Sequence, residues 1–157
     1  MAGGTASGKT EYATSYLTKK DQLVYDGTLK NEGGFVIKSK NIQKYTKGRA
    51  KLKVVLILPL DLFKSLDVFF ARERKMPLEN FFFTQIKSKH TVSKLLENTT
   101  TRVEIYVSSY RKDSERLTYQ RLTFKSRRKA SEFLQELIKY EREIALENGF
   151  DISVGRV

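Results

Sequence analysis

The stretch GGTASGKT, residues 3–10, decides the fold of this 157-residue chain. Four residues separate Gly3 from Gly8, and Lys9 and Thr10 follow directly. Glycines let the backbone curl so that several N–H groups face one phosphate, a lysine reaches the outer phosphates, and a threonine hydroxyl can ligate Mg²⁺. The stretch therefore predicts a nucleotide-binding loop that opens a helix. Its predicted nucleotide contacts, with Thr10 also the metal ligand, are Gly3, Gly4, Thr5, Ala6, Ser7, Gly8, Lys9 and Thr10.

The segment before this loop is short. The carboxyl end of a buried strand normally anchors such a loop, but only Met1 and Ala2 precede Gly3. We expect the strand before the loop to be absent from this chain and to belong to an upstream segment. Without that strand, a hole would lie in the sheet beside residues 23–25 and 54–58, with unpaired backbone groups along an aggregation-prone edge.

The rest of the chain alternates between strand and helix patterns. Residues 51–58, KLKVVLIL, predict the clearest strand, because a continuous apolar run suits a strand that is covered on both faces. Further strands are expected at 23–25, 103–108 and 117–124, and helices at 11–17, 33–46, 60–73, 77–97 and 130–145. This order predicts one α/β domain spanning residues 1–157, similar to P-loop NTPases, with a mostly parallel sheet flanked by helices.

Composition narrows the class of protein. The chain is 39% hydrophobic, enough to bury a core, and it has no cysteine for disulfides or metal sites. The longest apolar run, 54–58, is too short to cross a membrane, so we expect a cytoplasmic protein without a membrane partner. The net charge of +12 favours polyanionic partners, such as nucleotides, nucleic acid or an acidic protein. A generally lysine-rich composition explains that charge equally well.

Several stretches together resemble one family, the zeta-toxin-like kinases. In chain order they are GGTASGKT, VYDGT, KVVLILP, ARERKMP and VEIYVSS, and the resemblance spans about residues 3 to 122. Those kinases use ATP and Mg²⁺ to phosphorylate a sugar hydroxyl of a UDP-amino sugar. More loosely, the chain is similar to chloramphenicol phosphotransferases and polynucleotide 5′-kinases. The resemblance implies a phosphotransferase, and it also implies an acidic antitoxin protein as a partner.

The resemblance also implies roles for individual residues. Asp26 in YDGT would be the base that accepts the acceptor's hydroxyl proton, and Thr28 would contact the acceptor. Arg72 and Arg74 in ARERKMP would stabilise the transferring phosphate. An Asp-Gly turn and a solvated basic helix end explain the same residues without function. Weaker candidates for acceptor phosphates are Lys87 and Lys89.

One stretch departs from the family, and other polar or aromatic residues have structural explanations. Ser108-Ser109 stands where the family often has Asp-Asn-Ser, which weakens any assignment of the substrate. Asp61 follows the central strand and is predicted to cap a helix rather than to bind Mg²⁺. The aromatic run 81–83 is predicted to pack in the core.

Two further functions stay open at this stage. A polynucleotide 5′-hydroxyl kinase would use the same loop and would account better for the basic charge. A basic module that binds nucleic acid or a protein without catalysis would explain the missing first strand, with the loop as a remnant.

Overall fold

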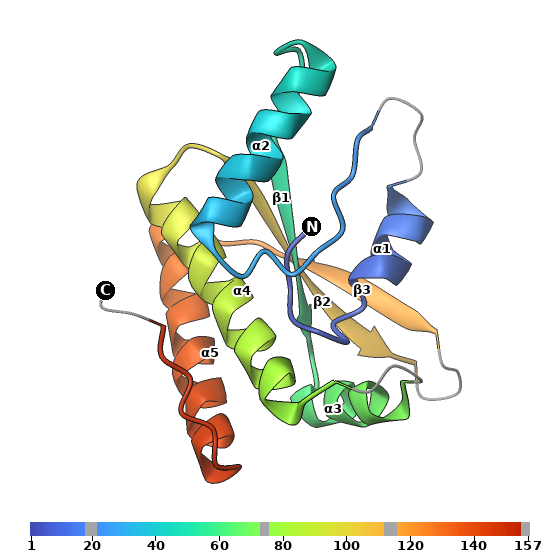
Figure 1. Cartoon of the computed structure of the whole chain (residues 1–157), viewed down its shortest axis with the longest axis vertical. Helices are drawn as coiled ribbons and strands as arrows, with labels where there is room; N and C mark the ends of the chain where they lie inside the picture. Colours follow the sequence, from blue (N-terminus) through green and yellow to red (C-terminus); the bar gives the residue numbers. More distant parts are fainter. Residues whose placement is uncertain (18–21, 73–75, 112–115, 155–157) are drawn as a thin grey trace.

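Figure 1 shows the computed structural model of the chain, which describes residues 1–17, 22–72, 76–111 and 116–154. The helices in these residues are α1 (Lys9–Tyr16), α2 (Glu32–Thr46), α3 (Leu62–Ala71), α4 (Leu78–Asn98) and α5 (Arg127–Glu147). The strands are β1 (Lys53–Pro59), β2 (Arg102–Tyr110) and β3 (Leu117–Leu122). Each of these elements matches a predicted one within a few residues. The predicted strand at 23–25 is wrong, because those residues are in neither a helix nor a strand of the sheet.

The sheet is mixed, in the order β1-β2-β3. β1 and β2 are parallel, from Lys53 opposite Arg102 to Pro59 opposite Ser108. β2 and β3 are antiparallel, and Tyr110 lies opposite Leu117. The expectation of a mostly parallel sheet therefore holds for the first pair and fails for β3. The reason is the length of the connection, since residues 111–116 are too few for the crossover that a parallel neighbour requires.

β1 is buried on both faces, as its apolar run predicts. Val54, Leu56 and Leu58 face one hydrophobic cluster, which α4 and α5 complete. Val55 and Ile57 face the other side, where Tyr12 of α1 covers them. Leu56 and Ile57 are both fully buried. β1 lies at the edge of the sheet in the order β1-β2-β3, yet both of its faces are covered by helices.

The long helices α4 and α5 lie side by side against the sheet (Figure 1). Their shared core includes Val92, Leu95 and Leu134. Arg127, the first residue of α5, donates hydrogen bonds to carbonyl groups near the carboxyl end of α4, namely those of Leu95, Leu96, Thr99 and Thr101. A cation at that end also opposes the negative pole of the α4 dipole. Arg127 therefore fixes how α5 begins against the end of α4.

Residues Met1 and Ala2 occupy the end of a strand position beside β1. The Ala2 N–H donates to the Val55 carbonyl (2.7 Å), and the Ile57 N–H donates to the Ala2 carbonyl (3.0 Å). This is an isolated parallel bridge between Ala2 and Leu56. The amino group of Met1 donates to the Tyr25 carbonyl (2.8 Å). Residues 23–25 are not part of the sheet because no strand of useful length lies between them and β1.

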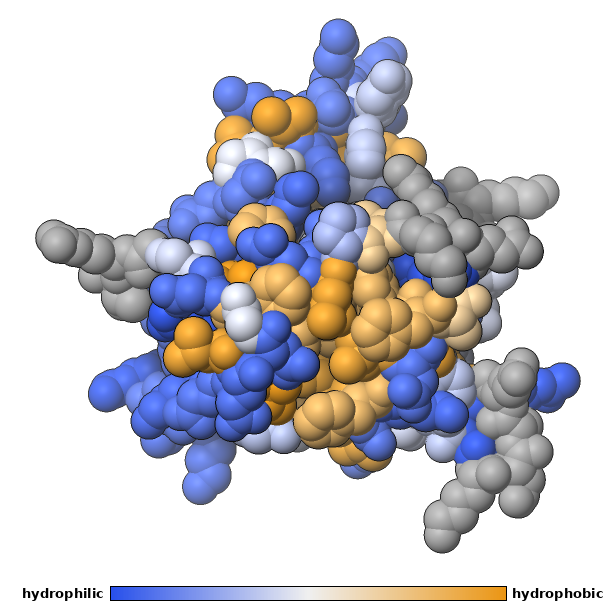
Figure 2. All heavy atoms as spheres, turned by 60° about the horizontal axis from the view of Figure 1, so that its bottom comes forward, coloured by the Kyte–Doolittle hydropathy of each residue, from blue (hydrophilic) through white to orange (hydrophobic). Residues whose placement is uncertain are grey.

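α3 lies below the loop in the view of Figure 1 and has two different faces. Asp61 caps the helix, because its Oδ1 accepts from the Lys64 N–H (3.0 Å), as predicted. The inner face contributes Phe69, which is buried with Phe81 and Phe82 of α4. Their burial confirms the prediction that the aromatic run 81–83 packs in the core. The outer side carries the exposed apolar side chains of Leu60, Phe63 and Phe70. Figure 2, in which the bottom of Figure 1 comes forward, shows an apolar patch on this side of the molecule.

Candidate phosphate-binding site

The loop of residues 3–8 runs from the Ala2 bridge to the start of α1 and is almost completely buried. Gly8 is the N-cap residue of α1 and has a φ of 85°, in the left-handed region that favours glycine. A Cβ at Gly8 would lie 2.8 Å from Leu117 Cδ1 on β3. Ala6 has a φ of 61° without being a glycine. The loop is therefore a strained turn that its surroundings hold in place.

Side chains from other elements hold the carbonyl groups of this loop. Five consecutive carbonyls, from Gly4 to Gly8, accept a side-chain hydrogen bond. The donors come from α1, α4, α3, β2 and β3. In order along the loop they are Lys9 Nζ to Gly4 (2.7 Å), Gln85 Nε2 to Thr5 (2.9 Å), Ser65 Oγ to Ala6 (2.6 Å), Ser108 Oγ to Ser7 (2.8 Å) and the Tyr119 hydroxyl to Gly8 (2.7 Å).

Three consecutive amide groups of the same loop have no partner within the described residues. They are the N–H groups of Ala6, Ser7 and Gly8. No side chain caps α1, so the first N–H groups of that helix are open as well. The Ser7 hydroxyl is buried and has no partner in the described part of the chain. Donors gathered at a positive helix end suit the oxygens of a phosphate group.

Lys9 adds the positive charge of this site. The pKa of Lys9 is lowered to about 8, mainly by burial and also by the charge of Arg72, while Asp26 and Glu11 partly oppose the shift. Its Nζ donates to the Gly4 carbonyl, so the side chain folds back over the loop. A bound phosphate would stabilise the charged form of this lysine, because an opposite charge offsets the cost of burial.

Thr10 and Asp26 meet at the exposed side of the loop. The Thr10 hydroxyl donates to Asp26 Oδ2 (2.7 Å), which joins α1 to the segment after residue 25. A hydroxyl and a carboxylate oxygen are ligands that Mg²⁺ accepts, and this ion takes one or two protein ligands together with phosphate oxygens. No cluster of three or more acidic, histidine or cysteine side chains exists among the residues with a described position. Thr10 therefore fits a metal that is bound jointly with a nucleotide, and the Asp26 carboxylate lies beside it.

Of the remaining predicted site residues, two lie beside the loop, one lies over an aromatic ring, and one lies outside the described residues. Arg72 is the C-cap residue of α3 and lies close enough to affect the pKa of Lys9, so it belongs with the loop. Thr28 is placed beside the loop by its backbone, whose carbonyl accepts from the Gly3 N–H (3.4 Å). Lys87 lies over the Phe83 ring, with its Nζ 5.7 Å from the ring centroid. Arg74 lies outside the described residues.

Lys89 has a structural role, which contradicts its prediction as a contact for an acceptor phosphate. It is 1% exposed and forms an ion pair with Glu141 of α5 (2.9 Å). Its Nζ also donates to the backbone carbonyl and to Oε1 of Gln85 (3.1 and 3.3 Å). Gln85 in turn holds the Thr5 carbonyl, so this buried network, Glu141–Lys89–Gln85, forms the floor of the loop.

Sequence reasoning missed the residues that hold the loop carbonyls. They are Ser65, Gln85, Ser108 and Tyr119, together with Thr84, whose hydroxyl accepts from the Thr5 N–H (2.9 Å). No local signal distinguished Thr84 and Gln85, because the buried face of α4 also carries Ser88, Lys89, Thr91 and Ser93. Ser108, which departs from the family pattern, has a defined role here as the donor to Ser7.

Comparisons with protein-family models, with curated proteins and with solved structures found no match to this chain. Among the helices whose residues are described, none is long and apolar enough to span a membrane.

Proposed function

We propose that this chain is an ATP-dependent phosphotransferase of the zeta-toxin-like kind, with a P-loop NTPase-like fold. It would transfer the γ-phosphoryl group of ATP to a hydroxyl of a small molecule such as a UDP-amino sugar. The observation that carries the proposal is the loop itself. Its carbonyls are bound by surrounding side chains, while the N–H groups of residues 6–8 and the start of α1 have no partner among the described residues and suit an anion.

Each residue of the site has a role in this reaction. The N–H groups of residues 6–8 and the start of α1 hold phosphate oxygens, and Lys9 neutralises their charge. Bound Mg²⁺, with Thr10 as its ligand from the chain, would supply further charge neutralisation. The acceptor oxygen gives its proton to Asp26 and displaces ADP from phosphorus. Arg72 offsets the charge that develops on the transferred group.

The position of Asp26 supports its role as the base. The carboxylate is exposed, so an acceptor can reach it, and its contact with Thr10 holds it beside the loop. A general base must lie within hydrogen-bond reach of the proton that it accepts. An Asp-Gly turn without function would not require the Asp26 carboxylate to lie within hydrogen-bond distance of Thr10, the residue that ends the phosphate-binding loop.

A transfer assay tests the proposal. The full chain is incubated with Mg²⁺ and γ-labelled ATP, separately with UDP-N-acetylglucosamine and with a 5′-hydroxyl oligonucleotide. We expect label on the sugar nucleotide, and a rate at least about 100-fold lower for Asp26→Asn, because a positioned general base contributes about that much or more. The matched control is Asp67→Asn, an exposed acid on α3, which should retain the rate of the unmodified chain.

The other results of this assay are equally informative. Label on the oligonucleotide alone would keep the phosphotransferase but replace the acceptor by a polynucleotide. An absence of label on both acceptors, with folded protein and bound Mg-ATP, would contradict the assignment of the acceptor class. An absence of label together with no binding of Mg-ATP would favour the non-catalytic module.

A further inference from the structure

Tyrosine side chains from α1, β2 and β3 gather on the face of the sheet that α4 and α5 do not cover. Tyr12 of α1 is buried at the centre of this group and packs against β1. The rings of Tyr16, Tyr106 and Tyr119 surround it, with centroids 5.0 to 5.1 Å from that of Tyr12. Tyr16 is 57% exposed, and Tyr106 and Tyr119 are half-buried. This face therefore presents parts of three aromatic rings to solvent.

One buried carboxylate on the same face gathers three cations. Glu104 is 5% exposed and lies two residues before Tyr106 on β2, so both side chains point to the same face. The Tyr106 hydroxyl donates to Glu104 Oε1 (3.1 Å). The cations that pair with the carboxylate come one each from the three strands, and they are Lys53 (3.4 Å), Arg102 (2.9 Å) and Arg121 (3.9 Å).

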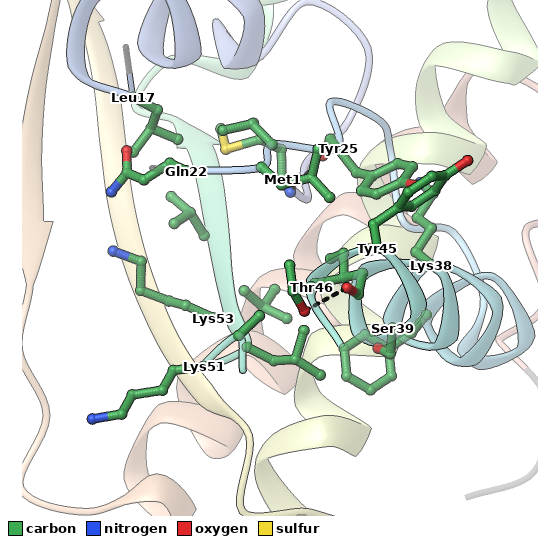
Figure 3. A pocket seen from close by; sticks show the side chains of 18 of the residues that line it. Met1, Leu17, Gln22, Tyr25, Lys38, Ser39, Tyr45, Thr46, Lys51 and Lys53 are labelled. Atoms are coloured by element: carbon green, nitrogen blue, oxygen red, sulfur yellow. Dashed lines mark hydrogen bonds between the residues drawn. The ribbon is translucent and has the colours of Figure 1, made fainter. Parts of the chain in front are cut away.

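The cations of this face outnumber its carboxylate and stay accessible. Figure 3, which looks into the cavity beside β1, shows the side chains of Lys51 and Lys53 extending in the same direction. Arg102 is 66% exposed and Arg121 is 49% exposed. A guanidinium group carries five N–H donors, and a contact with one carboxylate uses only part of them. Glu104 therefore holds two arginines in place while most of their donors face solvent.

These cations lie far from the phosphate-binding loop. Arg102 begins β2, whereas Ser108, which donates to Ser7 of the loop, lies near the other end of that strand. The six residue steps from 102 to 108 span about 20 Å at about 3.3 Å per residue. The ligand of these cations is therefore a different group from the phosphates that the loop would bind.

We call this surface the tyrosine–arginine face, which consists of Tyr16, Lys53, Arg102, Tyr106, Tyr119 and Arg121. It combines exposed aromatic rings with fixed guanidinium groups, and Tyr106 lies directly opposite Arg121 in the register of β2 and β3. Unpaired bases stack on aromatic rings in a way that every base permits, and arginines bind phosphate oxygens with two parallel hydrogen bonds. The face thus offers partners for both parts of a nucleotide chain.

We propose that the tyrosine–arginine face binds single-stranded nucleic acid, with phosphates on Arg102 and Arg121 and a base stacked on Tyr16. An acidic polypeptide would pair with the arginines but has no bases to stack on the tyrosines. A duplex keeps its bases stacked on one another, so it would also leave the rings unused. The net charge of +12 suits a polyanion of this kind. The proposal does not depend on the proposed phosphotransferase activity.

A binding titration tests the proposal. The probe is a 5′-fluorescein oligothymidylate of about twelve nucleotides, a length within the range that single-strand-binding domains cover. We expect saturable binding by fluorescence anisotropy. Three phosphate contacts predict that raising NaCl from 50 to 200 mM weakens this binding about 10- to 20-fold. Saturating Mg-ATP should leave the binding unchanged, because the loop is a separate site.

A pair of arginine variants locates the phosphate contacts. Arg121→Gln should weaken binding at least about fivefold and reduce its salt dependence, because one phosphate contact is lost. The carboxylate of Glu104 keeps its two nearer cations in this variant. Arg128→Gln is the matched control, since Arg128 is an exposed arginine on α5 that also pairs with a carboxylate, that of Glu132. It should bind like the unmodified chain.

A pair of tyrosine variants locates the stacked base. Tyr16→Ala should weaken binding at least about fivefold, because stacking on an aromatic ring is worth at least that much for each base. Tyr140→Ala on α5 is the matched control, because Tyr140 is 52% exposed, close to the exposure of Tyr16. This control should bind like the unmodified chain. Thermal melts establish that all four variants are folded.

Several results would overturn the proposal. They are an absence of saturable binding at 50 mM NaCl, or equal binding by the two variants of either pair. Competition by polyglutamate as strong as that by unlabelled oligothymidylate would assign the face to acidic polypeptides. Tighter binding of a duplex of the same length would exclude stacking, and displacement of the probe by Mg-ATP would place it in the loop.

Discussion

Lys89→Met should destabilise the fold by about 3–5 kcal/mol, which is among the largest single effects that we expect for this chain. Lys89 and Glu141 form an ion pair in which both side chains are almost fully buried. The substitution leaves the Glu141 carboxylate buried without its cation, and a buried charge that loses its partner costs far more than an exposed one. Urea unfolding of the variant and of the unmodified chain measures this difference.

Two controls distinguish the buried charge from a general packing defect. Lys129→Met breaks an exposed ion pair with Glu132 (3.2 Å) and should cost less than about 1 kcal/mol. The double variant Lys89→Met with Glu141→Met should recover most of the lost stability, because apolar pairs of similar volume often replace buried ion pairs without loss. A cost for Lys89→Met as small as that for Lys129→Met would contradict the role assigned to this pair.

The second large effect should come from Gly4→Ala, which we expect to weaken Mg-ATP binding at least about 100-fold, or about 2.7 kcal/mol. A Cβ at Gly4 would overlap the carboxamide of Gln85. Gln85 cannot easily move away, because it is fully buried and is bound to both Thr5 and Lys89. The new methyl group should therefore displace the loop, and titration calorimetry with Mg-ATP measures the loss.

Gly33→Ala is the matched control for this experiment. Gly33 is exposed in the first turn of α2, and a Cβ there would make an ordinary contact, 3.5 Å from Asn31 Oδ1. Alanine also favours a helix over glycine, so this variant should bind Mg-ATP like the unmodified chain. Thermal melts establish that both variants are folded. Binding by Gly4→Ala that equals binding by Gly33→Ala would contradict the assigned position of the loop.

The sequence predicted the local features of the site well, because they depend on short spacings. The pattern of residues 3–10 sufficed to predict a loop that leads into α1, and the apolar run 54–58 sufficed to predict a strand buried on both faces. Thr10 and Asp26 were assigned separate roles, and the structure brings them within hydrogen-bond distance. These features are encoded by residue types and their order.

The missed features depend on contacts between distant parts of the chain. Gln85, Ser108 and Tyr119 lie 80, 101 and 111 residues from the loop residues whose carbonyls they bind. No local pattern distinguishes such a serine or tyrosine from one that faces solvent. The direction of β3 was mispredicted for a different reason. The alternation of apolar and polar residues predicts a strand, but it does not show whether that strand runs parallel or antiparallel to its neighbour.

The most direct test of the central claim, that the loop binds nucleotide phosphates through its amides, is a titration of the ¹⁵N-labelled chain with Mg-ATP. We predict saturable shifts of the amide signals of Ala6, Ser7, Gly8 and Lys9 that exceed all others, because these N–H groups gain phosphate acceptors. Amides on α5, such as that of Tyr140, should stay unchanged. Saturable binding that leaves the loop amides unmoved, or no binding by the folded chain, would contradict the account.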